Sequence, residues 1–537
     1  MMGDLFQDLL SPAAYPEPRP AAVERRDTHI SAVYLAGDDV YKVKKAVDFG
    51  FLDFTTREKR TAACEAEVAL NRRLSPDVYL GVVPIVRDAS GAHRVGGEGE
   101  VVEHAVHMRR MADAERADQR LAQGALGGAD IDRIAIKLAE FHAACRAGED
   151  TAKFGTAEAI GVNVRENFTQ TREVLDHYLT AAEAKEIEAA QLGALEAMRS
   201  ALDARIDAGA VRDGHGDLRL EHVYLREGGG VTVLDCIEFN DRFRYADVAC
   251  DLAFLTMDLA HHRRVDLAER LLATYARETN DFDLYSVVDF YEGYRAYVRG
   301  KIATFLAENA AAPHELRASA AEEARRYFLL ALAARRPAVM RPRVVAVGGI
   351  IASGKSTLAG WIAARTGAPV DEADRTRKSM LGVAATTRVS DGAFSGAYDK
   401  SFTDRVYAEV NRRAGGAGVG PPCRARRLVS LAEDARRPGE FSRAHGVPFH
   451  FIECHAPPEV CKARLRHREQ QGGAVSDGRL AIFDDFKEWE PVRELPADEH
   501  LRRHLAARGA DARGGDGARR DMARRAPWVT RLFEYGL

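Results

Sequence analysis

The sequence predicts two domains: an α+β domain made of a β-rich lobe and a helical lobe, followed by an α/β domain of three layers. Three observations support this division. Alternating apolar residues on both sides of a Gly-Asp-Asp turn at 30–47 are typical of a β-hairpin, and helical periodicity dominates from about residue 130. A strand, a glycine-rich loop and an amphipathic helix are predicted one after another over 344–365.

The domain boundaries follow from the same patterns. Residues 313–335 have the periodicity of a long amphipathic helix, and the two prolines of RPAVMRPR after it indicate a connector. A length of 537 residues allows about three or four structural units. We therefore expect an N-terminal extension, a first domain, a linker, a second domain and an Arg/Gly-rich tail at 1–24, 25–335, 336–342, 343–500 and 501–537.

Composition and charge argue against several classes of protein. Lys and Arg total 77 against 81 Asp and Glu, so the net charge of −4 gives no overall attraction to nucleic acid or to an anionic membrane. The longest nearly continuous apolar stretch, Val344–Ala352, has nine residues, whereas a membrane helix needs roughly 20. The N-terminus lacks the pattern of a secretory signal. We expect a cytoplasmic protein, with no membrane partner, and the charge does not favour a nucleic-acid partner.

The first domain should begin with the β-rich lobe. Its predicted elements are two hairpin strands, a helix and a further strand, at 30–35, 39–47, 57–74 and 81–87. The helical region that follows includes helices near 131–146 and 181–208, and it is interrupted by a compact segment at 211–251.

The interrupting segment carries two carboxylates at the ends of predicted elements. His215-Gly216-Asp217 precedes a short turn, and a glycine turn then leads into the apolar strand VTVL, which ends at Asp235. One carboxylate of such a pair can accept a hydroxyl proton while the other holds Mg²⁺ against phosphates. The alternative is that both acids cap helices or turns.

On these residues, the stretch 25–335 resembles the aminoglycoside phosphotransferase and choline kinase family, a relative of the protein-kinase fold. The resemblance implies that Asp217 is the catalytic base and Asp235 a metal ligand. One position departs from the family, which usually has Asn five residues after the HGD aspartate, where this chain has His222. We keep His222 as a candidate metal-site residue, although neutral imidazole is a poor ligand for Mg²⁺ and could instead hydrogen-bond Asp217 or a phosphate.

The resemblance also implies a lysine on the third strand that pairs with a helix glutamate and binds ATP. Lys42 and Lys44 alternate with apolar residues, so both should point to one face of the strand. Either lysine could reach the phosphates, and we favour Lys44, with Glu67 as the glutamate. A solvated strand edge is the alternative for each lysine.

The second domain contains the complete pattern GxxxxGK[ST]. Glycines let the backbone turn so that successive N–H groups point at phosphate oxygens, and the helix that follows adds its positive end. Lys355 would contact the β/γ phosphates and Ser356 would bind Mg²⁺. The predicted ATP-binding residues are Gly349, Ile350, Ile351, Ala352, Ser353, Gly354, Lys355, Ser356 and Thr357.

Two further groups of charged residues follow this loop. Asp374 and Arg377 come after a predicted second strand, where an acid can orient or deprotonate an acceptor hydroxyl and a cation can hold an anionic acceptor. Arg464 and Arg468 lie four residues apart on a predicted helix and could close over the transferred phosphate as a lid. A helix cap and a solvated charged face are the respective alternatives.

With GGIIASGKST, DEADRTRK and CKARLRHRE, residues 343–490 resemble the small P-loop kinases of the gluconate kinase and shikimate kinase type. Such kinases usually have an apolar strand that ends in Asp between the acceptor segment and the lid. Residues 410–446 offer only Arg/Gly/Pro-rich sequence and LVSLAED, which matches that strand poorly.

Together these patterns predict an α+β bilobal protein-kinase-like domain followed by an α/β three-layer P-loop NTPase domain. The function we expect is transfer of a phosphoryl group from ATP, with Mg²⁺, to a hydroxyl of a small-molecule acceptor, with two potential ATP sites. One alternative is a nucleotide-binding regulatory or scaffold protein in which one or both sites are inactive. Another is a kinase of the polynucleotide kinase or zeta-toxin type.

Overall fold

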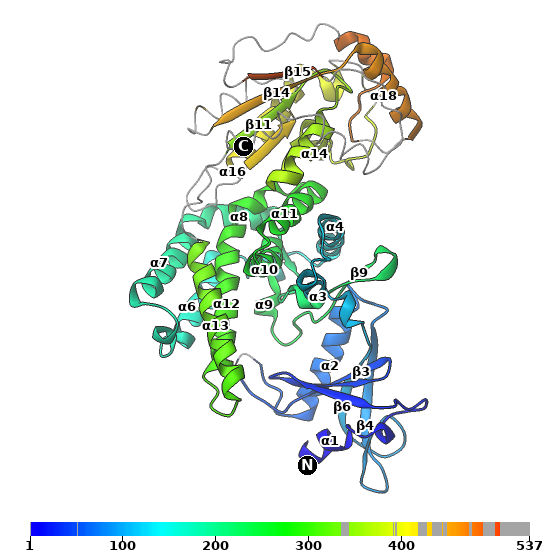
Figure 1. Cartoon of the computed structure of the whole chain (residues 1–537), viewed down its shortest axis with the longest axis vertical. Helices are drawn as coiled ribbons and strands as arrows, with labels where there is room; N and C mark the ends of the chain where they lie inside the picture. Colours follow the sequence, from blue (N-terminus) through cyan, green and yellow to red (C-terminus); the bar gives the residue numbers. More distant parts are fainter. Residues whose placement is uncertain are drawn as a thin grey trace.

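The computed structural model describes residues 2–50, 52–334, 343–389, 391, 395–416, 427–431, 443, 448–471, 475–486 and 500–504. Figure 1 shows a helical lobe between a small β lobe and a P-loop domain. Among the described residues, no helix has both the length and the apolar character needed to cross a membrane.

The small lobe is built on an antiparallel sheet with the strand order β1-β2-β3-β6-β4-β5. The predicted hairpin is present as β2 and β3, and helix α2 (Arg57–Asn71) packs against β4 and β6. The strands are β1 (Val23–Asp27), β2 (Ser31–Ala36), β3 (Asp39–Lys44), β4 (Tyr79–Arg87), β5 (His93–Val95) and β6 (Glu100–Arg109).

The N-terminal segment belongs to this lobe. Helix α1 (Met2–Asp8) and the turn η1 (Pro12–Ala14) place Leu5, Leu9 and Tyr15 in one apolar cluster with Tyr34 and Tyr41 of the sheet. The Tyr34 hydroxyl donates a hydrogen bond of 2.9 Å to the carbonyl of Phe6. The segment expected as an extension at 1–24 therefore covers one face of the sheet, and its expected end falls inside β1.

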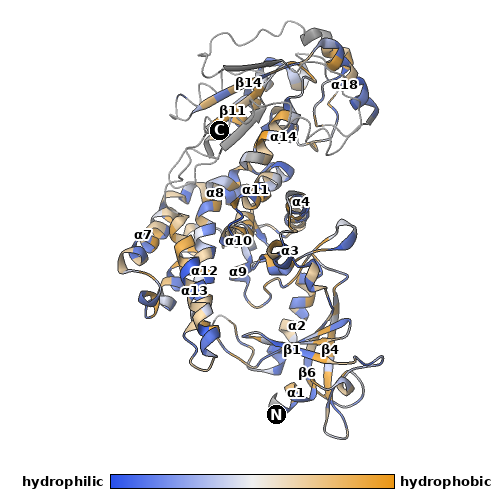
Figure 2. Cartoon of the chain, in the orientation of Figure 1, coloured by the Kyte–Doolittle hydropathy of each residue, from blue (hydrophilic) through white to orange (hydrophobic). Residues whose placement is uncertain are grey.

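The helical lobe is centred on α10, α12 and α13, which pack together in the largest apolar cluster of the described chain. Figure 2 shows both apolar and hydrophilic residues along α12 and α13, as expected for helices with one buried face. Two short hairpins, β7 with β10 and β8 with β9, carry the compact segment. The bounds are η2 (Asp113–Glu115), α3 (Ala117–Ala122), α4 (Gly128–Ala144), α5 (Glu149–Ala152), α6 (Ala157–Thr171), η3 (Leu175–His177), α7 (Ala181–Ala197), α8 (Arg199–Asp207), β7 (Val211–Asp213), η4 (Leu220–His222), β8 (Val223–Leu225), η5 (Glu227–Gly229), β9 (Val231–Val233), α9 (Asp241–Arg244), β10 (Tyr245–Asp247), α10 (Val248–His261), α11 (Val265–Thr279), η6 (Phe282–Ser286), α12 (Val288–Ala307) and α13 (His314–Ala333).

The P-loop domain has a parallel sheet with the order β12-β13-β11-β14-β15. Because the strands are parallel, their carboxyl ends lie at one edge, where ligands bind in such sheets. The bounds are β11 (Arg343–Gly348), α14 (Lys355–Thr366), β12 (Val370–Glu372), α15 (Ala373–Met380), η7 (Gly396–Tyr398), α16 (Lys400–Gly416), β13 (Arg427–Leu431), β14 (Phe449–His455), α18 (Pro458–Gln471), η8 (Leu480–Phe486) and β15 (His500–His504).

Two expectations for this domain differ from the structure. The residues RLVSL do form a strand, β13, which lies between β12 and β11, so the expectation of a poor strand was wrong. Pairing with strands on both sides supplies the backbone hydrogen bonds that a short isolated stretch lacks. Strand β15 crosses the expected start of the tail at 501. The linker at 336–342, Glu433, Asp434 and residues 505–537 lie outside the described residues.

The two domains are in direct contact. Helix α11 and η6 of the helical lobe meet α15 and α16 of the P-loop domain. Arg375 donates to the Arg277 carbonyl over 2.9 Å, and the Asn280 side-chain amide donates to the Ser379 hydroxyl over 2.7 Å. Arg412 makes two contacts with Asp283, at 2.7 and 3.0 Å.

Candidate active sites

The loop that carries Asp217 is fixed by helix α10. The carboxylate of Asp251 accepts hydrogen bonds from the backbone N–H groups of His215 (2.7 Å) and Gly216 (2.8 Å). Seven residues further along α10, Asp258 accepts one from the N–H of Leu220 at 2.9 Å. Both acids therefore hold the loop from one face of the helix. Sequence analysis missed them, although acids in the apolar stretch DVACDLAFLTMDL are unusual enough to have indicated a role.

His215 links the two segments that carry the predicted catalytic carboxylates. Its Nε2 lies 2.9 Å from the carbonyl of Leu234, and its Nδ1 accepts the backbone N–H of Asp217 at 3.2 Å. Burial lowers the pKa of His215 to about 4, so the ring is neutral at neutral pH. His215 thus has a positioning role between Asp217 and the strand that ends before Asp235.

The backbone at Asp235 is held from the small lobe. The N–H of Asp235 donates to the Tyr79 hydroxyl (3.1 Å), and that of Cys236 donates to the Asn71 side chain (2.9 Å). Asp235 has φ 68, a left-handed conformation that few residues other than Gly, Asn and Asp adopt. These contacts aim its carboxylate at Lys42.

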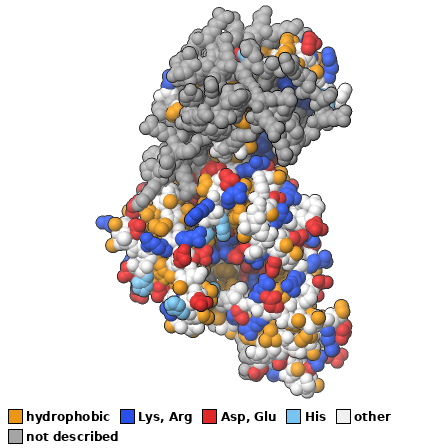
Figure 3. Space-filling view, in the orientation of Figure 1, with side chains coloured by type: hydrophobic (Ala, Val, Ile, Leu, Met, Phe, Trp, Pro, Cys, Tyr) orange, Lys and Arg blue, Asp and Glu red, His pale blue; other side chains and the backbone are white. Residues whose placement is uncertain are grey.

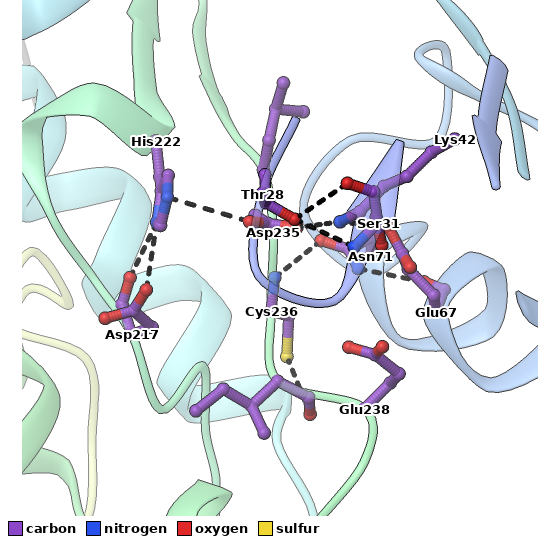
Figure 4. Close-up of polar contacts among 12 residues, drawn as sticks. Thr28, Ser31, Lys42, Glu67, Asn71, Asp217, His222, Asp235, Cys236 and Glu238 are labelled. Carbon is purple, nitrogen blue, oxygen red and sulfur yellow. Dashed lines mark hydrogen bonds and ion pairs between the residues drawn. The ribbon is translucent and has the colours of Figure 1, made fainter. Parts of the chain in front are cut away.

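Both predicted lysines reach Glu67, as the shared strand face predicts. Figure 4 shows Lys42 beside Glu67 and Asp235. Lys42 Nζ lies 2.9 Å from Glu67 Oε1 and 2.5 Å from Asp235 Oδ1. Lys44 Nζ lies 2.5 Å from Glu67 Oε2 and also contacts Glu238, a residue that sequence analysis missed. The side chain of Lys44 is 0% exposed and that of Lys42 is 11% exposed. Lys42 is therefore the lysine that faces the predicted metal ligand.

His222 lies between the two carboxylates (Figure 4). Its Nδ1 is 2.8 Å from the Asp217 carbonyl, and its Nε2 is 3.7 Å from Asp235 Oδ2. Arg219 lies beside the same group, with its Nε 3.2 Å from Asp217 Oδ1. Burial raises the pKa of Asp217, but Arg219 and His222 outweigh burial and bring it to about 2. Asp217 is therefore ionised at neutral pH.

The residues present fit a magnesium ion that is shared with nucleotide phosphates. The Asp235 side chain is 46% exposed, so its oxygens are accessible, and Mg²⁺ is commonly held by one or two carboxylates together with phosphates and water. No group of three or more His, Cys, Asp or Glu that could hold a metal occurs in the described part of the chain. His222 fits the ion less well, because its Nδ1 already bonds the Asp217 carbonyl and its Nε2 is a nitrogen donor.

The second predicted site is formed by the loop between β11 and α14. Gly349, Ala352 and Gly354 have φ values of 134, 60 and 109, which gives the loop its tight turns. Lys355 Nζ donates to the carbonyls of Gly349 (2.7 Å) and Ile350 (3.0 Å). The remaining predicted residues differ in burial. The Ser353 side chain is buried, and Ile350 and Ile351 pack beside Cys461 and Leu465. Ser356 and Thr357 are exposed at the start of α14.

Arg464 of α18, one of the two predicted lid arginines, lies at this loop and donates a hydrogen bond of 3.0 Å to the Ala352 carbonyl. Arg468 lies one turn further along α18 and is half-buried. At the end of β12, Asp374 is paired with Arg377 at 2.7 Å, and the Arg377 guanidinium lies 4.3 Å from the ring centroid of Tyr398. The predicted acceptor pair therefore exists as one ion pair against an aromatic ring.

The fold and these sites define a class of protein. A lysine–glutamate pair in a β lobe, opposite two carboxylates on a helical lobe, is the arrangement of a kinase-like phosphotransferase. A strand, a phosphate-binding loop and a helix within a parallel sheet define a P-loop kinase domain.

Comparisons with known proteins agree with this class. Residues 33–291 match the phosphotransferase enzyme family, and residues 344–491 match an AAA domain family. An uncharacterized protein of Mycobacterium tuberculosis is 33% identical over 401 residues, which cover 75% of this chain and 77% of the relative. A dephospho-CoA kinase of Anaeromyxobacter dehalogenans is 30% identical over 221 residues, which cover 33% of this chain and 95% of that protein.

The chain therefore belongs to the family of the mycobacterial protein, with a phosphotransferase-family domain followed by a P-loop kinase domain. Among solved structures, a choline/ethanolamine kinase family protein from Mesorhizobium loti has 14% identity and a TM-score of 0.36, covering 62% of this chain and 99% of that chain. A gluconokinase from Sinorhizobium meliloti has 17% identity and a TM-score of 0.22, covering 37% of this chain and 99% of that chain.

Proposed function

We propose that the N-terminal domain transfers the γ-phosphoryl group of ATP to a hydroxyl of a small molecule. The observation that carries this proposal is the contact of Lys42 with both Glu67 and Asp235, on the far side of His222 from Asp217. In such an arrangement Lys42 and Asp235 would meet the phosphates and their metal ion, beside Asp217, an acid that can receive a hydroxyl group.

Each residue has a role that its surroundings support. Asp217, ionised and held by the loop, orients the acceptor hydroxyl and accepts its hydrogen bond. Lys42 rather than Lys44 contacts the phosphates, because Lys44 is enclosed between Glu67 and Glu238. When bound, Mg²⁺ supplies charge neutralisation on the phosphates, and Asp235 is the residue that would hold it. His222 keeps Asp217 and Asp235 at a fixed separation.

For the P-loop domain we propose a second kinase site. Lys355 and Ser356 would bind the β/γ phosphates and Mg²⁺, Asp374 and Arg377 would face the acceptor, and Arg464 would contact the transferred group. The likeness of part of this chain to a dephospho-CoA kinase supports a phosphotransferase function. Its acceptor is a separate question from that of the first domain.

ADP release with Mg²⁺-ATP, measured over a panel of sugars, sugar acids, amino alcohols and aminoglycosides, tests the proposal. We expect acceptor-stimulated turnover that falls about 10² to 10⁴-fold in Asp217→Asn or in Lys355→Ala, depending on the acceptor. Asp203→Asn, at an exposed acid of α8, is the matched control and should leave the rate unchanged. Tight ATP binding without turnover on any acceptor would instead favour a nucleotide-binding regulatory protein.

A further inference from the structure

Helix α12 carries two arginines toward the interior of the helical lobe. Arg295 is 4% exposed, and its guanidinium lies 4.6 Å from the ring centroid of Phe254 on α10. Four residues on, the guanidinium of Arg299 lies 5.7 Å from the ring centroid of Tyr327 on α13. A spacing of four places both side chains on one face of the helix.

Among the described residues, neither arginine has the carboxylate partner that a buried guanidinium normally has. Within the described residues, neither forms an ion pair within 4.0 Å, and the buried Nε of each has no hydrogen-bond partner. Arg295 and Arg299 act on the nearby Cys250 thiol and Tyr327 hydroxyl, respectively, and lower the pKa of each against the effect of burial. Burial raises the pKa of Cys250 to about 11 and that of Tyr327 to about 12, so both groups are neutral at neutral pH. In the described part of the chain, neither positive charge is therefore in direct ion-pair contact with a carboxylate, although Asp217 and Asp251 act on Arg295 from a longer distance.

Both arginines interact electrostatically with Asp217. Arg219 adds a third guanidinium in direct contact with the same carboxylate, at 3.2 Å.

The acids of the neighbouring elements are already engaged. Glu166 is held by Arg242 at 2.7 and 2.8 Å, and Glu323 lies 3.3 Å from His261. Asp251 and Asp258 hold the backbone of the catalytic loop. Figure 3 shows this face of the molecule hollowed between the helical lobe and the small lobe, with both basic and acidic side chains along the border. Three guanidinium groups, those of Arg219, Arg295 and Arg299, thus act on the Asp217 carboxylate.

We propose that the acceptor of the N-terminal site carries an anionic group, a phosphate or a carboxylate, besides its reacting hydroxyl, and that Arg295 and Arg299 bind this group. A guanidinium binds either anion through two parallel hydrogen bonds, and burial strengthens the attraction. The same charges disfavour amines, so amino sugars and amino alcohols should be poor acceptors here. This inference rests on the proposed function, because it assigns the acceptor class of the same site.

The first experiment measures binding of inorganic phosphate by its effect on thermal unfolding. Saturating Mg²⁺-AMP-PNP occupies the nucleotide phosphate positions of both domains, so any remaining binding is on the acceptor side. We expect phosphate to raise the melting temperature of the wild type but not of Arg299→Met or of Arg295→Lys. Arg326→Met, at an exposed arginine of α13, should respond like the wild type. An equal shift in Arg299→Met, or no shift in the wild type, would overturn the inference.

The second experiment compares four acceptors that share a primary hydroxyl: glycerol, glycerate, glycerol phosphate and ethanolamine. We expect ADP release to be highest with an anionic member, and Arg299→Met to raise the KM for that member about tenfold without changing the KM for ATP. Comparing the KM for glycerate with that for glycerol phosphate shows whether the site prefers a carboxylate or a phosphate.

The two proposals fail in different ways. In one outcome, the protein turns over ethanolamine or glycerol with a KM that is the same in the wild type and in Arg299→Met. This result would overturn the proposal of an anionic acceptor, and the proposed kinase activity would stand. In the other outcome, phosphate binding depends on the arginines while none of these acceptors, nor the wider panel, stimulates ADP release. This result would overturn the proposed kinase activity, and the anion site would stand.

Discussion

Two lysines on β3 share Glu67, yet their surroundings give them different tasks. Lys42 is partly exposed and contacts Asp235, whereas Lys44 is enclosed between Glu67 and Glu238. Removing one partner of a buried ion pair leaves an uncompensated charge, which is strongly destabilising. A solvent-accessible lysine that faces a ligand can be removed with less damage to the fold.

This difference predicts opposite effects of two matched substitutions. Lys42→Met should lower ATP-dependent turnover about 100-fold or more, with an unfolding free energy close to that of the wild type. Lys44→Met should lower the free energy of unfolding by roughly 3 to 5 kcal/mol, because Glu238 loses its buried partner. Urea titration and ADP release, measured on both variants, check this assignment, and the reverse pattern would return the phosphate-binding role to Lys44.

At the scale of elements, the P-loop and the helix that follows it contain two glycines that differ in the space available for a side chain. A Cβ added at Gly349 would lie 2.3 Å from the carbonyl oxygen of Cys454, and the positive φ adds strain. At Gly360, in the middle of α14, an added Cβ would meet no heavy atom of the described residues within 4 Å, apart from the backbone of its own helix and its chain neighbours.

Gly349→Ala should therefore abolish nucleotide binding by the P-loop domain, whereas Gly360→Ala should leave binding intact. The second change should also stabilise the fold by about 0.5 to 1 kcal/mol, since alanine is the better helix residue. Titration with a fluorescent ATP analogue in an Asp235→Asn background isolates the P-loop site. Equal affinities in the two variants would show that the loop tolerates a side chain at Gly349.

The elements that were predicted correctly have local sequence patterns. The hairpin of β2 and β3, helix α2 and the P-loop each depend on a periodicity or a glycine spacing within about 20 residues. The missed features depend on distant partners. Glu238 was missed because only the folded chain brings it to Lys44, and β13 because its neighbours β11 and β12 supply its pairing. The choice between Lys42 and Lys44 also depends on distant partners, since nothing local shows which lysine Asp235 faces.

At the scale of the whole molecule, Arg413 of α16 joins the two domains. Its Nη1 lies 2.9 Å from Asn280 Oδ1 in the helical lobe and 2.9 Å from Thr376 Oγ1 in the P-loop domain. The same nitrogen lies 3.4 Å from the buried carboxylate of Asp371, which begins the predicted acceptor segment. Asp371 therefore lies directly behind the interface between the domains.

Asp371 should make the stability of the protein depend on pH. Burial raises the pKa of Asp371 to about 6 from 3.8, against the opposing effect of Arg413. The folded state therefore binds this proton more tightly than the unfolded state, and the contribution of Asp371 to stability falls as pH rises from about 4 to 6, by up to about 3 kcal/mol. Urea midpoints over this range should show that decline in the wild type. Asp371→Asn should lack it and Asp203→Asn should keep it, so identical slopes in all three proteins would contradict the assignment.

The left-handed backbone of Asp235 restricts which amino acids the position accepts in evolution as well as in the laboratory. Glycine, asparagine and aspartate adopt φ 68 readily, while a residue with a branched or bulky side chain would strain the strand end. Descendants that give up catalysis at this site are therefore expected to drift first to Asn or Gly. A relative with either residue at this position would combine an intact fold with loss of the proposed metal ligand, and its N-terminal domain would be expected to be inactive.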